Sequence, residues 1–250
     1  LFIRLNRALE LTPEGARYYA AIKGPLQHLK NATADLLSDQ QVHQFRINSI
    51  PFITNTLLVP HLQSFKNKHP NLKIQIESKV KRVDFGAGVT DVAIRYKNGG
   101  EADLHYEEIT PISITPVCSQ DYLKKYQSRY PNLDGPHNIV RLTNDPVSWA
   151  SWMDKWNPNI KIDDELLLDN YQAVLDSAQR GFGLIMGYLP ALLPYIKRSE
   201  LALPFPNQEC ESGHLYLVYQ KSDKDLDTIQ SFQSWFKKLI NGLLAYGIDE

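Results

Sequence analysis

Residues 44–77, QFRINSIPFITNTLLVPHLQSFKNKHPNLKIQIE, contain one complete strand–helix–strand unit. Residues 44–50 and 72–77 alternate polar with apolar side chains, and this period of two is typical of half-buried strands. Between them apolar residues recur at helical spacing, and Thr54 with Asn55 supplies a candidate N-terminal cap for that helix. Strand, helix and strand in this order predict an open α/β sheet.

The sequence on the C-terminal side continues the same pattern. Residues 89–96, VTDVAIRY, form a short apolar run that predicts a buried parallel strand. From residue 112 onward, strand-like and helix-like stretches alternate again, without any internal repeat. We expect residues 201–205 to be a strand and residues 163–165 to be a solvated turn. The pattern predicts an α/β fold of two Rossmann-like lobes.

Composition excludes several classes of protein. The chain has 250 residues, 43% of them hydrophobic and 22% charged, which is ordinary for a globular protein and not for a disordered one. Its 27 basic and 28 acidic side chains leave a net charge of −1, so bulk charge favours neither nucleic acid nor a membrane as partner. Two distant cysteines exclude a disulfide framework. We expect a cytoplasmic protein without membrane contact, and the missing initiator Met suggests a fragment.

The first forty residues predict a helix that pairs with a second copy of the chain. Thr12 followed by Pro13 is a helix-start signature, because the hydroxyl caps the helix and proline needs no partner there. Pro25 should kink this helix. An ordinary amphipathic helix packed on its own domain is the alternative. Residues 19, 22, 26, 29, 33 and 36 are spaced by three and four positions, and this heptad pattern predicts a dimerisation seam. The members of the seam are Tyr19, Ile22, Leu26, Leu29 and Leu36.

The start of the chain also carries a family resemblance. The string Leu1-Phe2-x-Arg4-x-x-Arg7-x-Leu9-x-Leu11-Thr12-x-x-Gly15 resembles the end of the winged helix-turn-helix domain of LysR-type transcriptional regulators. The resemblance implies a wing hairpin over residues 1–13 and a linker helix over residues 14–42. It implies that the recognition helix lies upstream of this chain, and that Arg4 and Arg7 contact the DNA backbone without reading sequence.

The remaining two hundred residues resemble the effector domain of the same family. The closest branch is that of the glycine-cleavage activator and the β-lactamase regulator, and the motifs are LVPxLxxF at 58–65, VDF at 83–85, DVAIRY at 91–96 and PVCS at 116–119. The resemblance implies a two-lobed domain like the type 2 periplasmic binding proteins. Lobe I would comprise residues 43–111 and 211–250, and lobe II residues 112–210. Two crossovers would join the lobes around a small-molecule cleft.

Candidate ligand-binding residues follow from the rule that open α/β sheets bind ligands at the carboxyl ends of their strands. Arg95 ends a strand and could pair with a ligand carboxylate; a surface arginine bonding its own loop is the alternative. The neutral candidates could equally be plain caps or turn formers. The candidate effector-binding residues are Ser49, Ile50, Thr54 and Arg95 in the first lobe, with Thr115, Thr143 and Asn170 in the second.

No catalytic or cofactor motif competes with this interpretation. The histidines lack metal-ligand spacing, the glycines of residues 181–187 lack dinucleotide-binding spacing, and no nucleophile motif is present. We therefore expect neither an enzyme nor a bound cofactor or metal. The resemblance implies a LysR-type regulator that binds a small anionic effector, forms a homodimer or homotetramer, and binds promoter DNA through a head absent from this chain. A periplasmic-type binding protein without DNA function is the alternative.

Overall fold

The computed structural model describes residues 1–5, 8–19, 21–22, 26, 33, 43–79, 85, 90–96, 99–143, 148–156 and 158–245. At the N-terminus, β1 (Phe2–Leu5) and β2 (Ala8–Leu11) form an antiparallel hairpin. A helix follows from residue 13, and the hydroxyl oxygen of Thr12 accepts a hydrogen bond from the Gly15 amide at 2.9 Å. The predicted cap at Thr12 is therefore confirmed.

Gly15 is required by close packing between this helix and the start of the hairpin. A Cβ atom at position 15 would lie 2.0 Å from the carbonyl oxygen of Leu1. The same carbonyl accepts a hydrogen bond from the Thr12 amide at 3.0 Å. A side chain larger than hydrogen at position 15 would therefore separate the hairpin from its helix.

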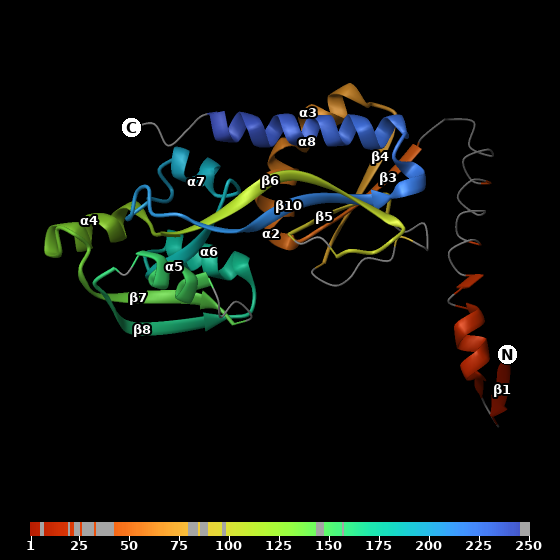
Figure 1. Cartoon of the computed structure of the whole chain (residues 1–250), viewed down its shortest axis with the longest axis horizontal. Coiled ribbons are helices and arrows are strands. Elements are labelled where there is room, and N and C mark those ends of the chain that lie inside the picture. Colours follow the sequence, from red (N-terminus) through yellow and green to blue (C-terminus); the bar gives the residue numbers. More distant parts are fainter. Residues whose placement is uncertain are drawn as a thin grey trace.

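The described residues between 43 and 245 contain one mixed sheet of eight strands in the order β4-β3-β5-β10-β6-β9-β7-β8 (Figure 1). One half contains the parallel strands β3 (His43–Ser49), β4 (Leu72–Ser78) and β5 (Val92–Arg95). The other half contains β9 (Leu184–Leu189), β7 (Gly135–Leu142) and β8 (Ile160–Leu168), also parallel. We refer to these halves with their helices as lobe I and lobe II. The α/β fold with two lobes is confirmed.

Two long antiparallel strands join the lobes. They are β6 (Leu104–Val117) and β10 (Cys210–Gln220), and they lie side by side through the middle of the sheet (Figure 1). β10 pairs with β5 of lobe I, and β6 pairs with β9 of lobe II. Because β6 leaves lobe I and β10 returns to it, lobe I is built from two separate stretches of chain, whereas lobe II is the single stretch between them.

Helices cover the sheet. In lobe I, α3 (Val59–Lys68) and α8 (Asp227–Ala245) pack on the same face, where Phe45, Phe65 and Phe232 form ring contacts. Lobe II carries helices on both faces, as its two separate core clusters indicate. These helices are α4 (Gln120–Arg129), α5 (Ser148–Trp156), α6 (Tyr171–Gln179) and α7 (Leu193–Lys197).

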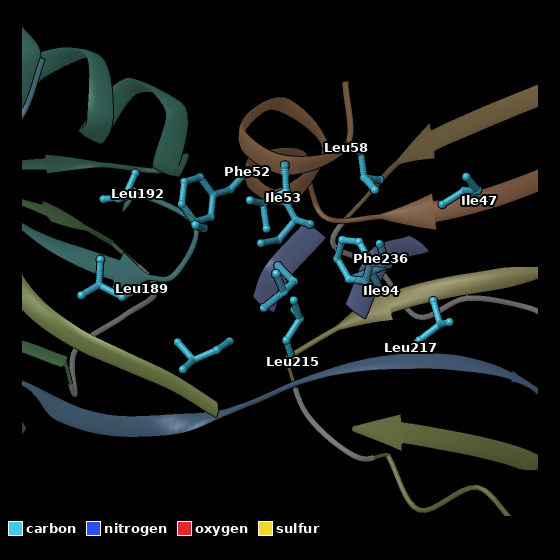
Figure 2. Close-up of a cluster of buried hydrophobic side chains, with 14 of the residues drawn as sticks. Ile47, Phe52, Ile53, Leu58, Ile94, Leu189, Leu192, Leu215, Leu217 and Phe236 are labelled. Carbon is cyan, nitrogen blue, oxygen red and sulfur yellow. The ribbon is translucent and has the colours of Figure 1, made fainter. Parts of the chain in front are cut away.

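The main hydrophobic core is continuous across the two lobes. Figure 2 shows Phe52 and Ile53 between Leu189 and Leu192 of lobe II and the strand residues of lobe I. Ile53, Leu192 and Leu215 expose at most 1% of their surface. The two lobes are therefore in contact through buried apolar side chains.

Three local predictions were wrong. The helix after β3 starts at Pro51 and not at Thr54, because proline suits the first helical position; α2 (Pro51–Ile53) continues into a π-helical turn, η1 (Thr54–Leu58). Residues 163–165 lie within edge strand β8 and not in a turn. In place of a strand at residues 201–205, the structure has one isolated bridge between Cys118 and Ala202.

Candidate functional site

Three candidate residues lie where β3 ends and α2 begins. Ser49 is fully buried at the end of β3, and Ile50 occupies the N-cap position of α2 without a side-chain cap bond. Thr54 is inside the helical run, where its hydroxyl oxygen accepts a hydrogen bond from Ser78 at 3.2 Å. The three residues lie close together, but Thr54 is not the helix cap that its sequence context indicates.

Arg95 ends β5, as predicted, and its guanidinium contacts its own lobe. It donates hydrogen bonds to the side-chain oxygen of Asn48 and to the carbonyl oxygen of Ile94. Asn48 in turn donates to Glu77 at 2.9 Å, and Lys79 holds the pKa of that carboxyl below its usual value. Both acceptors of Arg95 are neutral, and no carboxylate of the described residues lies within 4.0 Å of it. Burial lowers the pKa of Arg95.

The candidate effector-binding residues of lobe II lie at two separate positions in the sheet. The Thr143 hydroxyl donates to the carbonyl oxygen of Leu168 at 2.9 Å, and Asn170 caps α6 by accepting a hydrogen bond from Ala173 at 2.9 Å. Both residues therefore act as turn and cap formers at neighbouring strand ends. Thr115 lies apart from them in β6, fully buried, and among the described residues its hydroxyl has no hydrogen-bond partner.

Aromatic side chains that the sequence analysis missed connect the lobes beside these candidates. Phe52 of lobe I contacts Tyr171 edge-on at a centroid distance of 4.4 Å, and Tyr171 contacts Tyr188 at 5.1 Å. The Asn55 amide donates to Gln172 across the same boundary at 3.4 Å. The start of α6 thus faces the helical turn that contains Thr54.

Tyr96 is a second residue that the sequence analysis missed. Its ring stacks on Tyr188 with centroids 6.2 Å apart, and both tyrosines line a cavity of about 10 Å³ between the lobes. The Tyr96 hydroxyl is enclosed and has no hydrogen-bond partner among the described residues. Burial raises its pKa, so the group is a neutral phenol. Tyr96 directly follows Arg95 in the chain, so an alternation rule would have placed it on the opposite face of β5.

Tyr188 links this cavity to a second one of about 10 Å³ on the lobe II side, which Tyr171, Trp149 and Met186 help to line. Each cavity has room for about one water molecule. The indole nitrogen of Trp149 is buried without a partner among the described residues. The region between the lobes therefore combines aromatic walls with unused hydrogen-bond donors, which is a chemistry suited to binding a small molecule.

The remaining predicted residues belong to the N-terminal segment. Arg4 lies in β1 opposite Leu9, whereas Arg7 lies outside the described residues. Of the predicted seam, Tyr19 is 51% and Leu26 57% exposed, and Ile22 is partly exposed. Leu29 and Leu36 also lie outside the described residues.

The described residues offer little else for chemistry. No group of three or more metal-ligating side chains is found among them, and none of their helices is both long and apolar enough to cross a bilayer. Cys118 and Cys210 are free and buried, and burial raises the pKa of the Cys118 thiol to about 12. Cys118 is therefore a packed side chain and not an activated nucleophile.

Comparison with known proteins agrees with this architecture. The glycine cleavage system transcriptional activator of Escherichia coli K12 is 27% identical over 240 residues, covering 94% of this chain and 77% of that protein. The HTH-type transcriptional regulator DsdC of the same strain is 23% identical over 247 residues, covering 96% of this chain and 79% of that protein. The HTH-type transcriptional activator AmpR of Enterobacter cloacae is 22% identical over 241 residues, covering 94% and 80%.

Solved structures share the fold. The effector domain of AmpR from Pseudomonas aeruginosa superimposes with a TM-score of 0.65 at 18% identity, covering 82% of this chain and 99% of that one. CrgA from Neisseria meningitidis, described as a LysR-type transcriptional regulator, superimposes with a TM-score of 0.61 at 18% identity, covering 97% and 83%. The LysR substrate binding domain matches residues 38–240. The chain therefore belongs to the family of LysR-type transcriptional regulators and contains their substrate-binding domain.

Proposed function

We propose that this chain is the linker helix and effector-binding part of a regulator whose full-length form binds promoter DNA through a winged-helix head. The observation that carries the proposal is the match of the substrate binding domain over residues 38–240, preceded by a hairpin and a helix. Arg4 and Arg7 would contact DNA phosphates beside that head. A promoter-binding regulator works where the chromosome is, so we place the protein in the cytoplasm. The hairpin and helix favour this function over a periplasmic binding protein.

The proposed effector is a small anionic molecule that enters between the lobes. Arg95 supports an anion, because its half-buried charge meets only neutral acceptors among the described residues. Ser49, Ile50 and Thr54 would contact the effector from lobe I. Thr115, Thr143 and Asn170 would contact it from lobe II.

The unpartnered Tyr96 hydroxyl adds a neutral donor or acceptor to this proposed site. Phe52, Tyr171 and Tyr188 would move apart to admit the effector, because the cavities they enclose hold only about one water molecule each. A ligand that binds the opened and closed arrangements unequally shifts the balance between them.

Self-association of the chain would link the change in lobe arrangement to DNA binding. Tyr19 and Leu26 expose apolar surface along the N-terminal helix, as a paired helix requires. On the effector domain, Ile162 and Leu167 of edge strand β8 are 49% and 51% exposed, and they offer a second contact surface. We propose a homodimer or homotetramer in which lobe closure changes the packing of dimers and hence the spacing of DNA heads.

Native mass spectrometry of the purified protein tests the proposal. We expect a bound species of small mass whose release in acid yields an anionic metabolite. Loss of one charge-assisted contact of about 1.5–3 kcal/mol predicts that Arg95→Ala weakens its binding about ten- to hundredfold.

The melting temperature of Arg95→Ala is the control, and Arg95→Lys is the matched variant that keeps the charge. Unchanged affinity in Arg95→Ala would exclude Arg95 from the site and leave the hydroxyls as anchors. A lower melting temperature with lower affinity would instead assign Arg95 the role of bracing β3.

A further inference from the structure

One cavity beside the junction of the two lobes contains none of the candidate effector-binding residues. Its volume is about 440 Å³, which lies in the range of small-molecule pockets. The cavity lies beside β6 and β10, the two strands that join the lobes and that we call the crossover strands. The junction of β9 with α7 and the end of α8 complete its wall. Its apolar wall includes Ile112, Leu189, Leu193 and Leu244, and its acidic wall consists of Glu209 and Glu211.

Few positively charged groups lie close to the two carboxylates of this pocket. Glu209 accepts a hydrogen bond from the neutral hydroxyl of Ser113. No lysine or arginine nitrogen among the described residues lies within 4.0 Å of the Glu209 carboxylate, since Lys155 bonds only its backbone oxygen at 2.7 Å. For Glu211 the partner is the ring nitrogen of His214, at the limiting distance of 4.0 Å. The pocket therefore pairs apolar surface with negative charge.

We propose that this hinge pocket binds a small molecule that has an apolar body and a protonated amine. The apolar body would cover Leu189, Leu193 and Leu244, and the ammonium group would lie between Glu209 and Glu211. An anion is disfavoured here by repulsion, so this pocket and the proposed effector cleft select opposite charges. The inference concerns a separate site and does not depend on the proposed function.

The location makes the pocket a regulatory site. Leu189 and Leu193 belong to lobe II, Leu244 belongs to the helix that packs on lobe I, and Ile112 belongs to a crossover strand. A molecule bound there contacts both lobes at once, so it must bind some lobe angles better than others.

Calorimetric titration with 4-phenylbutylamine tests the proposal, with 4-phenylbutanol and 4-phenylbutyrate as matched probes of the same apolar body. We expect the amine to bind at least tenfold more tightly than the alcohol, and the carboxylate not to bind. Equal affinities for amine and alcohol would overturn the recognition of charge. Absence of binding by the amine at millimolar concentration would overturn the site itself.

Variants locate the binding. Glu209→Gln and Glu211→Gln should each weaken the amine about tenfold and leave the alcohol unchanged, whereas Glu10→Gln removes one exposed carboxylate of β2 and should change neither. Leu244 is 46% exposed, so Leu244→Trp can fold, and its larger ring should fill the pocket and weaken both probes. Amine binding that survives Leu244→Trp and both glutamine variants would overturn the proposal.

Discussion

Removing the enclosed hydroxyl of Tyr96 should stabilise the protein. The hydroxyl has no hydrogen-bond partner among the described residues, and an unsatisfied buried polar group costs about 1–3 kcal/mol. The adjoining cavity of about 10 Å³ can admit about one water molecule, which would offset part of that cost. We therefore expect Tyr96→Phe to raise the free energy of unfolding by about 1 kcal/mol, the lower end of the range.

Calorimetric melting and urea unfolding measure this change. For a chain of this length, 1 kcal/mol corresponds to a rise in melting temperature of about 2–4 °C. Tyr171→Phe is the matched control, because the Tyr171 hydroxyl donates to the carbonyl oxygen of Met186 at 2.6 Å. Its loss should lower stability by about 1 kcal/mol.

The two substitutions delete the same atom type from neighbouring tyrosines and should act in opposite directions. A lower melting temperature in Tyr96→Phe would refute the reasoning, because it would mean that the hydroxyl is satisfied in solution. Equal shifts in both variants would mean that ring packing, and not hydrogen bonding, determines the effect.

Three further predictions concern assembly, DNA and pH. A chain that starts at Gln44 should form a smaller oligomer in analytical ultracentrifugation than the whole chain, and an unchanged oligomer would remove the N-terminal helix from the interface. Binding of DNA by the present chain should be weak, insensitive to sequence and strongly reduced by salt, so sequence-specific binding at about 150 mM salt would contradict the assignment of residues 1–13 to a wing. His137 is fully buried with a pKa that burial lowers, so the folded state binds fewer protons than the unfolded state. The free energy of unfolding should therefore fall below pH 6.5 by up to about 1.4 kcal/mol per pH unit, and His137→Gln should flatten that fall.

Local chemistry made much of the fold predictable. Alternation located β3 and β4 almost to the residue, and the caps at Thr12 and Asn170 each accept a hydrogen bond as such caps do. Such signals depend on neighbours within one turn, so the sequence contains them directly. The prediction of a helix start at Thr54 was wrong because Pro51 provides an earlier start. When two helix-start signals lie so close together, the local sequence does not show which of them begins the helix.

The contacts between lobes could not be predicted in this way. Asn55 and Gln172 are 117 positions apart, and Phe52 meets Tyr171 only after both lobes have folded against one another. Aromatic residues at such positions resemble ordinary core residues in the sequence. Tyr96 carries no local signal of its role, because the charge of Arg95 lies on one face of β5 and the cavity that Tyr96 lines lies on the other.

The crossover strands also constrain how the protein is made. β10 and α8 are the last elements along the chain, yet β10 is the strand beside β5, and Phe232 and Phe236 of α8 complete the core around Phe45. During synthesis from the N-terminus, lobe I therefore lacks β10 and α8 until all of lobe II has left the ribosome. Lobe II, by contrast, has every one of its helices and parallel strands in a single uninterrupted stretch before β10 emerges. A ribosome that pauses within β10 would leave lobe I with an open strand edge, which is the state most exposed to aggregation and to chaperones.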